Sequence, residues 1–309
     1  MPPVFAAPAY DPLAAKDAAP TFRDFTATDA KRGRDIPVRV YLPSDAKAAP
    51  VVLFSHGLGG SKDNNPYLGQ HWAARGYVVV VMQHAGSDET VWKNKPMRDI
   101  KPAMQKAAGS ENFLLRAGDV TTVLDALTTW NADAKHALHN RLDLAHVGMS
   151  GHSFGAVTTQ AVSGQTFAGA SLTDKRIDAA LAMSPSAARQ SGDNKKAFGA
   201  VTIPWCLMTG TNDDAPIGSV DAKSRRLVFP ALPPGDKYEL VLHGAEHGAF
   251  GERALRGEKS KRDPRYHKAI LAISTAFWDA TLRGDTEAKA WLKSDARSVL
   301  DKRDTWQTK

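Results

Sequence analysis

Short runs of apolar residues recur along most of the chain, and a segment of mixed polarity follows each of them. Runs of this length that are rich in valine and leucine are typical of strands buried on both faces of a sheet. They read PVVLF, YVVVVM, LAHVGM, AALAM, IPWCLM and YELVL. Segments with helical spacing lie between them, at 65–76 and 112–130, and a long amphipathic segment follows at 267–284. This alternation predicts an α/β fold, a mostly parallel twisted sheet with helices on both faces.

Two other segments have patterns of their own. Residues 21–30 and 36–43 alternate between polar and apolar side chains on either side of KRGRD, which predicts an antiparallel pair of half-exposed strands at the edge of the sheet. In the segment 112–130, apolar residues recur at helical spacing, and we expect them to form its buried face. These residues are Leu114, Val120, Val123, Leu124 and Leu127.

Length and composition indicate a globular protein. The chain has 309 residues, of which 42% are hydrophobic, and no linker-like composition divides it. We predict a single domain over residues 21–309, preceded by an extended segment rich in alanine and proline over residues 1–20. No apolar run reaches the length that a membrane span needs. The first residues lack the basic stretch followed by an apolar one that marks a signal peptide. The sequence therefore fits a cytoplasmic protein, and it also fits a periplasmic or secreted protein whose leader was removed. The single Cys206 agrees with either compartment.

The formal net charge of +7 raises the question of an anionic partner such as a nucleic acid. Lysine and arginine cluster at 93–101 and 253–268, but acids, prolines and alanines interrupt both clusters. Neither cluster has the interleaved aromatic residues of a single-strand binder. We therefore interpret both clusters as solvated surface and expect no nucleic-acid partner. The sequence leaves the oligomeric state open.

Polar loops rich in glycine follow several of the apolar runs, and in a parallel sheet such loops meet at the carboxyl ends of the strands. One of these loops contains Ser153 within Gly-His-Ser-Phe-Gly, where a strand gives way to a helix. A sharp turn of this kind needs small residues on both sides, and Gly151 and Gly155 provide them. The pattern predicts that Ser153 is an exposed nucleophile, with an ordinary turn serine as the alternative.

A serine nucleophile needs a base, and the base needs an acid that orients it; along many hydrolase chains the order is serine, acid, histidine. Asp213, after the run IPWCLM, and His247, after the run YELVL, fit this order. We predict that they are the acid and the base. Asp214 is the second candidate for the acid, although the pair of aspartates could instead cap a helix or lie in a solvated turn. His243 ends a predicted strand, and we expect it to be structural.

Two backbone amides are expected to stabilise the negative charge that develops when a serine attacks a carbonyl group. The amide of Phe154 would lie at the start of a helix, where N–H groups are unpaired, and the amide of Leu58 lies in the loop SHGLGG.

The spacing of the glycines in the loop SHGLGG fits neither a P-loop nor a dinucleotide-binding loop, so nucleotide binding is not expected. We also expect no metal and no organic cofactor, because the chain supplies nucleophile, base and amides; a calcium site at Asp213 and Asp214 has no support.

Loops over the mouth of such a site would set its specificity. The candidates are residues 84–92, the stretch from there to about 110, and the loop around 187–199. Within them and near the predicted base, we expect His84, Trp92 and Phe250 to contact substrate. Each of the three could instead be an ordinary packing residue.

The segments FSHGLGGS, VMQH, GHSFG, GTND and GAEH occur in this order within residues 36–280. In this the chain resembles α/β-hydrolases, in particular serine esterases of the platelet-activating-factor acetylhydrolase type and the related dienelactone-hydrolase-like group. The resemblance implies the α/β-hydrolase fold, Ser153 as nucleophile, and oxyanion amides at Leu58 and Phe154.

The chain departs from that pattern at two places. Dienelactone hydrolases use a cysteine nucleophile, whereas Cys206 lies within a predicted strand, so dienelactone chemistry is not implied. In the acetylhydrolases the acid follows the strand after the nucleophile helix, but here that strand reads AALAMSPS and carries no carboxylate. Asp213, one strand later, is placed as in cutinase-like polyester hydrolases and general esterases.

These observations favour a serine hydrolase that cleaves carboxylic esters through an acyl-enzyme, with a carboxylesterase for short to medium acyl chains as the first hypothesis. Its partner would be a small-molecule or lipid-like ester. An interfacial lipase, a phospholipid acetylhydrolase and a polyester hydrolase are the alternatives of the same class. An amidase, a thioesterase and a binding module without activity are further alternatives.

Overall fold

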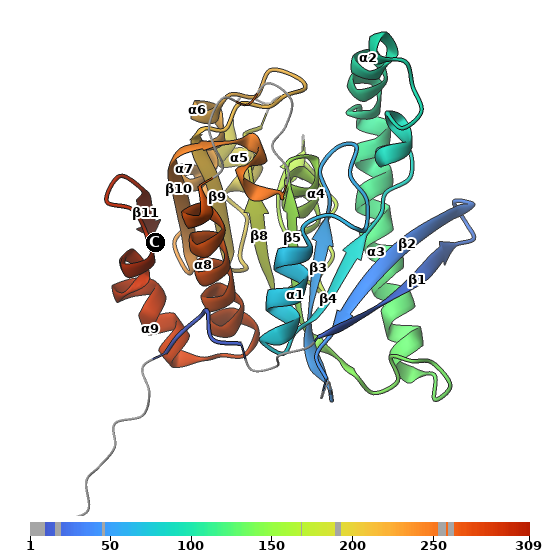
Figure 1. Ribbon diagram of the computed structural model, residues 1–309, viewed down its shortest axis with the longest axis horizontal. Helices are drawn as coiled ribbons and strands as arrows, with labels where there is room; N and C mark the ends of the chain where they lie inside the picture. Colours follow the sequence, from blue (N-terminus) through green and yellow to red (C-terminus); the bar gives the residue numbers. More distant parts are fainter. Residues whose placement is uncertain are drawn as a thin grey trace, which may run out of the picture.

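The computed structural model describes residues 10–15, 20–44, 47–167, 169–188, 193–252, 258 and 263–309. Its largest element is a sheet with the strand order β1-β2-β4-β3-β5-β8-β9-β10-β11 (Figure 1). The strands are β1 (Thr21–Asp29), β2 (Arg34–Leu42), β3 (Ala49–Ser55), β4 (Val78–Met82), β5 (Leu142–His152), β8 (Ala179–Met183), β9 (Trp205–Asn212), β10 (Lys237–Glu246) and β11 (Thr305–Thr308).

The strands from β4 to β10 in this order run parallel to one another. The predicted edge pair, β1 and β2, is antiparallel, and β2 joins β4 antiparallel as well. At the other edge β11 pairs antiparallel with β10. A separate hairpin is formed by β6 (Thr166–Phe167) and β7 (Ala170–Ser171). The parallel centre brings the loops after β3, β5, β9 and β10 to the same edge of the sheet.

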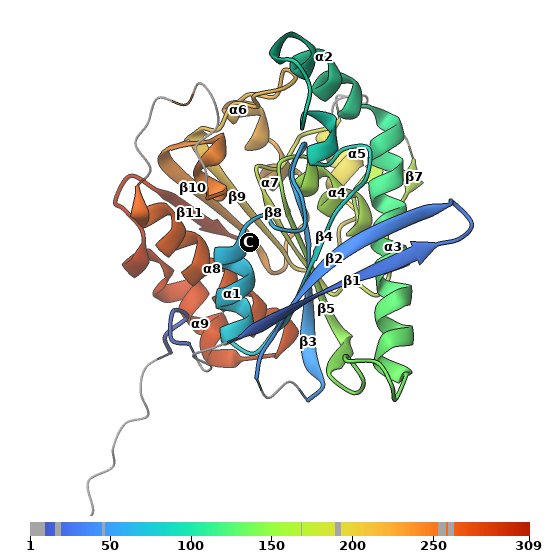
Figure 2. The ribbon, with the colours of Figure 1, turned by 45° about the vertical axis from the view of Figure 1, so that its right-hand side comes forward.

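Helices cover both faces of the sheet, as Figures 1 and 2 show from two directions. The longer helices are α1 (Pro66–Ala74) and α8 (Pro264–Leu282) on one face, and α3 (Ser110–Ala132) and α4 (Phe154–Val162) on the other. The others are α2 (Met97–Ala107), α5 (Asn194–Phe198), α6 (Ala222–Arg225), α7 (Val228–Ala231) and α9 (Thr286–Ser294), with 3₁₀ turns η1 (Glu89–Val91), η2 (His247–Phe250) and η3 (Ala296–Val299). The predicted architecture, a mostly parallel sheet with helices on both faces, is confirmed.

The alternating sides of one strand explain why the central runs are apolar throughout. In β3, Val52 and Phe54 pack in the core on the side of α1 and α8, whereas Val51 and Leu53 pack in the core on the side of α3. All five residues of β4 are buried. A strand covered on both faces has no solvent side, so it needs no polar positions.

The buried face of α3 differs from the predicted one. Leu114 is 56% exposed, while Arg116 and Asp119 are buried together with the predicted Val120. At 3.6 residues per turn, Leu114 lies about 180° around the helix from the buried Val123, whereas Arg116 and Asp119 lie within about 40° of it. The prediction for Leu114 was wrong because it followed residue type rather than position around the helix.

Four elements were not expected from the sequence. The stretch from residue 84 to about 110 was expected to form loops, yet it contains η1 and α2, and α2 stands beyond the carboxyl ends of the strands in Figure 1. The end of the chain forms α9 and β11. Among the described residues, no helix combines the length and the apolar character that crossing a bilayer requires.

A buried carboxylate ties the first described residues to the helices behind the sheet. Asp279 in α8 accepts hydrogen bonds from the hydroxyl groups of Tyr77, at 2.6 Å, and Tyr10, at 2.8 Å. It also accepts one from Nε of Arg75, at 3.0 Å, and lies within 3.3 Å of Arg283. The predicted segment 1–20 is therefore docked onto α8 where it is described, at residues 10–15.

We predict that Asp279→Asn lowers the free energy of unfolding by about 3 kcal/mol, because removing the charge from a buried pair leaves its arginine uncompensated. Urea denaturation measures the change. As a control, Asp125→Asn removes a surface partner of Arg176, and should change stability by less than about 0.5 kcal/mol. Equal stability of the two variants would contradict this view of the Asp279 cluster.

Candidate active site

The turn between β5 and α4 holds Ser153 in a strained conformation, with φ 59° and ψ −118°. The backbone N–H of Ser153 donates to the carbonyl of Met183 at 3.0 Å, which ties the turn to β8. A Cβ at Gly155 would collide with the carbonyl group of Ser55, and one at Gly151 would collide with the carbonyl of Gly155. The two flanking glycines are therefore required by close backbone contacts, as the sequence predicted.

Ser153, His247 and Asp213 come together in one line of hydrogen bonds. Oγ of Ser153 lies 2.8 Å from Nε2 of His247, and Nδ1 of His247 lies 2.6 Å from Oδ1 of Asp213. The other carboxylate oxygen of Asp213 accepts a hydrogen bond from Thr209 at 2.8 Å. Because Nδ1 faces a carboxylate, it carries the ring proton and donates it, which leaves Nε2 free to accept the proton of the serine hydroxyl.

The topology explains how these distant residues meet. Ser153 follows β5, Asp213 follows β9 and His247 follows β10, and all three strands end at the same edge of the sheet. Asp214 faces away, is exposed, and accepts a hydrogen bond from the N–H of Ala222 at the start of α6. The structure thus brings Asp213 to the histidine, while Asp214 binds the first residue of α6, whose N-cap is Asp221.

A buried arginine that the sequence did not point to lies against the acid. Nε of Arg225 donates to the carbonyl of Asp213 at 2.7 Å and lies 3.2 Å from its carboxylate. Nη1 donates to the carbonyls of Ser184 and Pro185 at the end of β8. Burial raises the pKa of Asp213, but the hydrogen bond from His247 and the charge of Arg225 outweigh it and hold this pKa below its usual range. The carboxylate is therefore ionised at neutral pH.

A second histidine ring packs beside the line of hydrogen bonds. The ring centroid of His152 lies 4.7 Å from that of His247 and 5.7 Å from that of Phe250. Burial, together with the charge of His247, lowers the pKa of His152 to about 3, so its ring is neutral. Its Nε2 atom is buried and has no hydrogen-bond partner within the described ranges. His152 thus adds a neutral wall beside Ser153.

The two amides predicted to hold an oxyanion belong to residues close to the serine. A Cβ at Gly57 would lie 3.4 Å from Cβ of Ser153, so Leu58, the next residue, is at the side of the serine. Phe154 is the first residue of α4, where amides have no partner inside the helix. The neighbouring Gly59 N–H donates to Ser87, but the N–H of Leu58 makes no hydrogen bond in the part of the chain that the structure describes.

Of the three residues predicted to contact substrate, two are buried and one is exposed. His84 is fully buried and bonded to Ser55 and Asp119, so it cannot line the mouth as predicted. Phe250 is also fully buried and belongs to the core next to α8. Trp92 is 41% exposed, and its ring N–H donates to the carbonyl of Gly59 at 2.7 Å, next to Leu58. Of the three, Trp92 alone has surface beside the loop; part of the predicted mouth loop at 187–199 lies outside the described residues.

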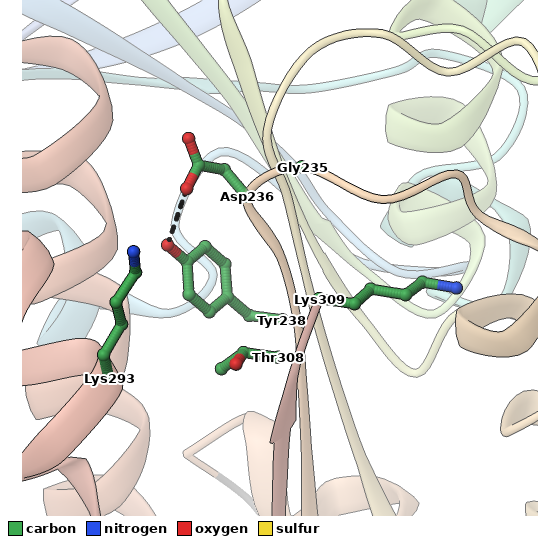
Figure 3. Close-up of a pocket in the computed structure, with 6 residues that line it drawn as sticks. All are labelled: Gly235, Asp236, Tyr238, Lys293, Thr308 and Lys309. Carbon is green, nitrogen blue, oxygen red and sulfur yellow. Dashed lines mark hydrogen bonds between the residues drawn. The ribbon is translucent and has the colours of Figure 1, made fainter.

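A small pocket of about 230 Å³ lies away from this site, between β10, β11 and α9 (Figure 3). Its lining is Gly235, Asp236, Tyr238, Lys293, Thr308 and Lys309. The hydroxyl group of Tyr238 donates to Asp236 at 3.3 Å, as the dashed line in Figure 3 marks. None of the residues around Ser153 contributes to this pocket, so we assign it no part in the site.

Comparison with known proteins gives two matches. Residues 36–109, which include the loop of Leu58, match the family model described as platelet-activating factor acetylhydrolase, isoform II. Cutinase est2 of Thermobifida alba is 25% identical over 210 residues, which are 68% of this chain and 56% of that protein. The chain therefore spans a little more than half the length of this relative.

The strained backbone of Ser153 leads to a prediction about stability. A non-glycine residue in this region costs about 1–3 kcal/mol, whereas glycine adopts it freely. Ser153→Gly should therefore be more stable than Ser153→Ala by about 1 kcal/mol in urea denaturation. At the exposed helical position Ser294 the order of the same two substitutions should reverse by a similar amount. If alanine is the better residue at both positions, the turn is not strained in solution.

Proposed function

We propose that this chain, whose sequence resembles those of serine esterases, hydrolyses carboxylic esters through an acyl-enzyme at Ser153. The observation that carries this proposal is the unbroken line of hydrogen bonds from Asp213 through His247 to the hydroxyl of Ser153, at 2.6 Å and 2.8 Å. The arrangement supplies a nucleophile, its base and the acid that fixes the base. The names of the matched family model, an acetylhydrolase, and of the relative, a cutinase, support the proposal.

In the first half-reaction Nε2 of His247 takes the hydroxyl proton while Oγ of Ser153 attacks the carbonyl carbon of the ester. The carbonyl oxygen becomes an oxyanion, which accepts hydrogen bonds from the N–H groups of Leu58 and Phe154. Asp213 continues to accept the hydrogen bond from Nδ1 of His247 and stabilises the imidazolium, without taking up the proton itself. When the tetrahedral intermediate collapses, the alcohol leaves with the proton from Nε2 and the acyl group remains on Ser153.

In the second half-reaction water replaces the alcohol. Nε2 of His247 removes a proton from the water as its oxygen attacks the acyl carbon, and the same two amides hold the second oxyanion. Collapse of this intermediate returns the proton to Oγ of Ser153 and releases the carboxylic acid. Every proton that His247 takes up is given back within the cycle.

We favour esters with short to medium acyl chains as substrates, because side chains pack closely around the serine. Phe250 and His247 are buried, and the His152 ring packs against both. A second candidate is an interfacial lipase, phospholipid acetylhydrolase or polyester hydrolase. It is favoured by two exposed apolar residues: Trp92, 41% exposed beside the loop of Leu58, and Met97, 64% exposed at the start of α2. The cutinase similarity points the same way.

We predict that the protein hydrolyses 4-nitrophenyl esters and that Ser153→Ala lowers kcat by about 10⁶-fold without loss of fold, because no other group can form the acyl-enzyme. Rates from acetate to palmitate, compared for the wild type and the variant, measure both activity and chain-length preference. A maximum at short chains supports the carboxylesterase. Activity that persists at long chains, or on polyester films, supports the interfacial candidate. A rate that does not depend on Ser153 contradicts the proposal.

The acid and the base have their own matched controls. Asp213→Asn should lower kcat by about 10³–10⁴-fold, because the amide no longer holds the required histidine tautomer, while Asp214→Asn should stay within about threefold of the wild type. His247→Ala should lose activity as Ser153→Ala does, and His243→Ala should not. The measurement is kcat on the best ester of the series. A large loss in Asp214→Asn with a small one in Asp213→Asn would move the acid by one residue.

A further inference from the structure

A second arginine, Arg116 in α3, is completely buried behind the loop that carries Leu58. Unlike Arg225, it has no carboxylate within ion-pair distance among the residues that the structure describes. Its donors go to neutral acceptors instead, and burial lowers its pKa. A buried charge without a direct ion pair is costly to a fold, so the hydrogen bonds around Arg116 have to stabilise it there.

The guanidinium fixes the backbone immediately before Leu58. Nη1 of Arg116 donates to the carbonyl of His56 at 2.7 Å, and Nη2 donates to the carbonyl of Gly57 at 3.4 Å. The carbonyl of Gly57 and the N–H of Leu58 belong to one planar trans peptide group, in which they point in opposite directions. Holding the carbonyl toward Arg116 therefore turns the N–H of Leu58 away from it, toward the site.

His56 adds a second donor to the same carbonyl. Its Nε2 accepts a hydrogen bond from the backbone N–H of His84 at 3.0 Å, so the ring proton is on Nδ1. Nδ1 lies 2.6 Å from the carbonyl of Gly57 and donates to it. Burial, followed by the charge of Arg116, lowers the pKa of His56 well below its usual value, so the ring stays neutral in this role.

The same guanidinium also contacts the other amide donor. Cζ of Arg116 lies 4.4 Å from the centroid of the Phe154 ring, the geometry of a cation–π contact. Phe154 is the residue whose N–H starts α4. One buried cation thus touches both segments that would carry the oxyanion donors.

A buried chain of polar groups keeps Arg116 in place. Nδ1 of His84 donates to Asp119 at 3.0 Å, and Nε2 of His84 accepts from Oγ of Ser55 at 2.9 Å. Ser55 in turn accepts a hydrogen bond from Nη1 of Arg116 at 3.3 Å, and Ser87 accepts one from Nε at 2.8 Å. Ser55, His84 and Asp119 form the same series of hydrogen bonds, from serine to histidine to aspartate, as Ser153, His247 and Asp213. All three are fully buried, so they can support Arg116 but cannot contact a substrate.

We propose that Arg116 is a positioning residue for the oxyanion site: it aims the N–H of Leu58, braces Phe154, and places a positive charge behind the oxyanion. The proposal rests on the proposed function. A preorganised donor acts mainly on the transition state, where the negative charge develops, and less on substrate binding. Loss of Arg116 should therefore appear in kcat and in the affinity for a transition-state analogue.

The test compares Arg116→Met, Arg116→Lys and the control Arg75→Met on a 4-nitrophenyl ester, with kcat expressed per active site titrated by a fluorophosphonate. Arg116→Met should lower kcat by about 10²-fold and weaken inhibition by a boronic acid to a similar degree, with KM within about threefold. Arg116→Lys keeps the charge but not the planar fork, and should lose about 10-fold.

Arg75 is the matched control because it too is a buried arginine with several hydrogen bonds. It binds Asp279 and the carbonyls of Asp11 and Ala14. It follows α1 just before β4 begins, so it lies at the amino ends of the parallel strands, whereas Ser55 lies at their carboxyl ends. Arg75→Met should lower stability and leave kcat per active site unchanged. A merely structural role of Arg116 would give the same result, fewer active sites with normal kcat, and would overturn the proposal.

Three further outcomes of the experiment can be told apart. If Arg116→Met does not fold, Ser87→Ala removes the acceptor of Nε and should lower kcat by about threefold to tenfold; an unchanged kcat overturns the proposal. If Ser153→Ala keeps its activity, the proposed function has failed, whatever Arg116 does. If Ser153 is required but the Arg116 variants keep both kcat and boronic acid affinity, the role of Arg116 alone is refuted.

Discussion

The close approach of α4 to the end of β3 is the constraint on which the site depends. Gly155 lies against the carbonyl of Ser55, where no side chain fits. This contact sets the start of α4, and with it the position of Ser153 and of the amide of Phe154, relative to the loop that leaves β3. Because the side chain of Ser55 also belongs to the buried polar chain of His84 and Asp119, one backbone contact joins the nucleophile turn to the network behind the oxyanion loop.

Two buried arginines give the site its electrostatic character. Arg225 lies against Asp213, holds the acid to the end of β8, and favours its ionised form. Arg116 lies behind Leu58 and Phe154 and makes no direct ion pair with a carboxylate in the described chain. The nearby rings of His84 and His152 are kept neutral by burial. A negative charge that forms at a substrate between these elements would therefore meet fixed positive charge and amide dipoles, and little competing water.

The sequence predicted the sheet well, because strands covered on both faces leave continuous apolar runs. It also led to Ser153, Asp213 and His247, because each follows a strand and the ends of parallel strands meet; the structure brings these three together, and their roles stay a proposal. The sequence did not lead to Arg116, Asp119 or Arg225. A polar residue on a helix normally faces water, and the partners that bury these three are distant in the chain. The same cause explains His84, which was expected at the mouth and is buried against Asp119.

The central claim is that Ser153 is a nucleophile activated by His247, and covalent labelling tests it most directly. The protein is treated with a fluorophosphonate, and the intact mass and the modified peptide are measured for the wild type, Ser153→Ala and His247→Ala. The account predicts one adduct per chain on Ser153, no adduct in Ser153→Ala, and labelling slower by several orders of magnitude in His247→Ala. An adduct on another residue, or ester hydrolysis that continues while Ser153 stays unlabelled, would contradict it.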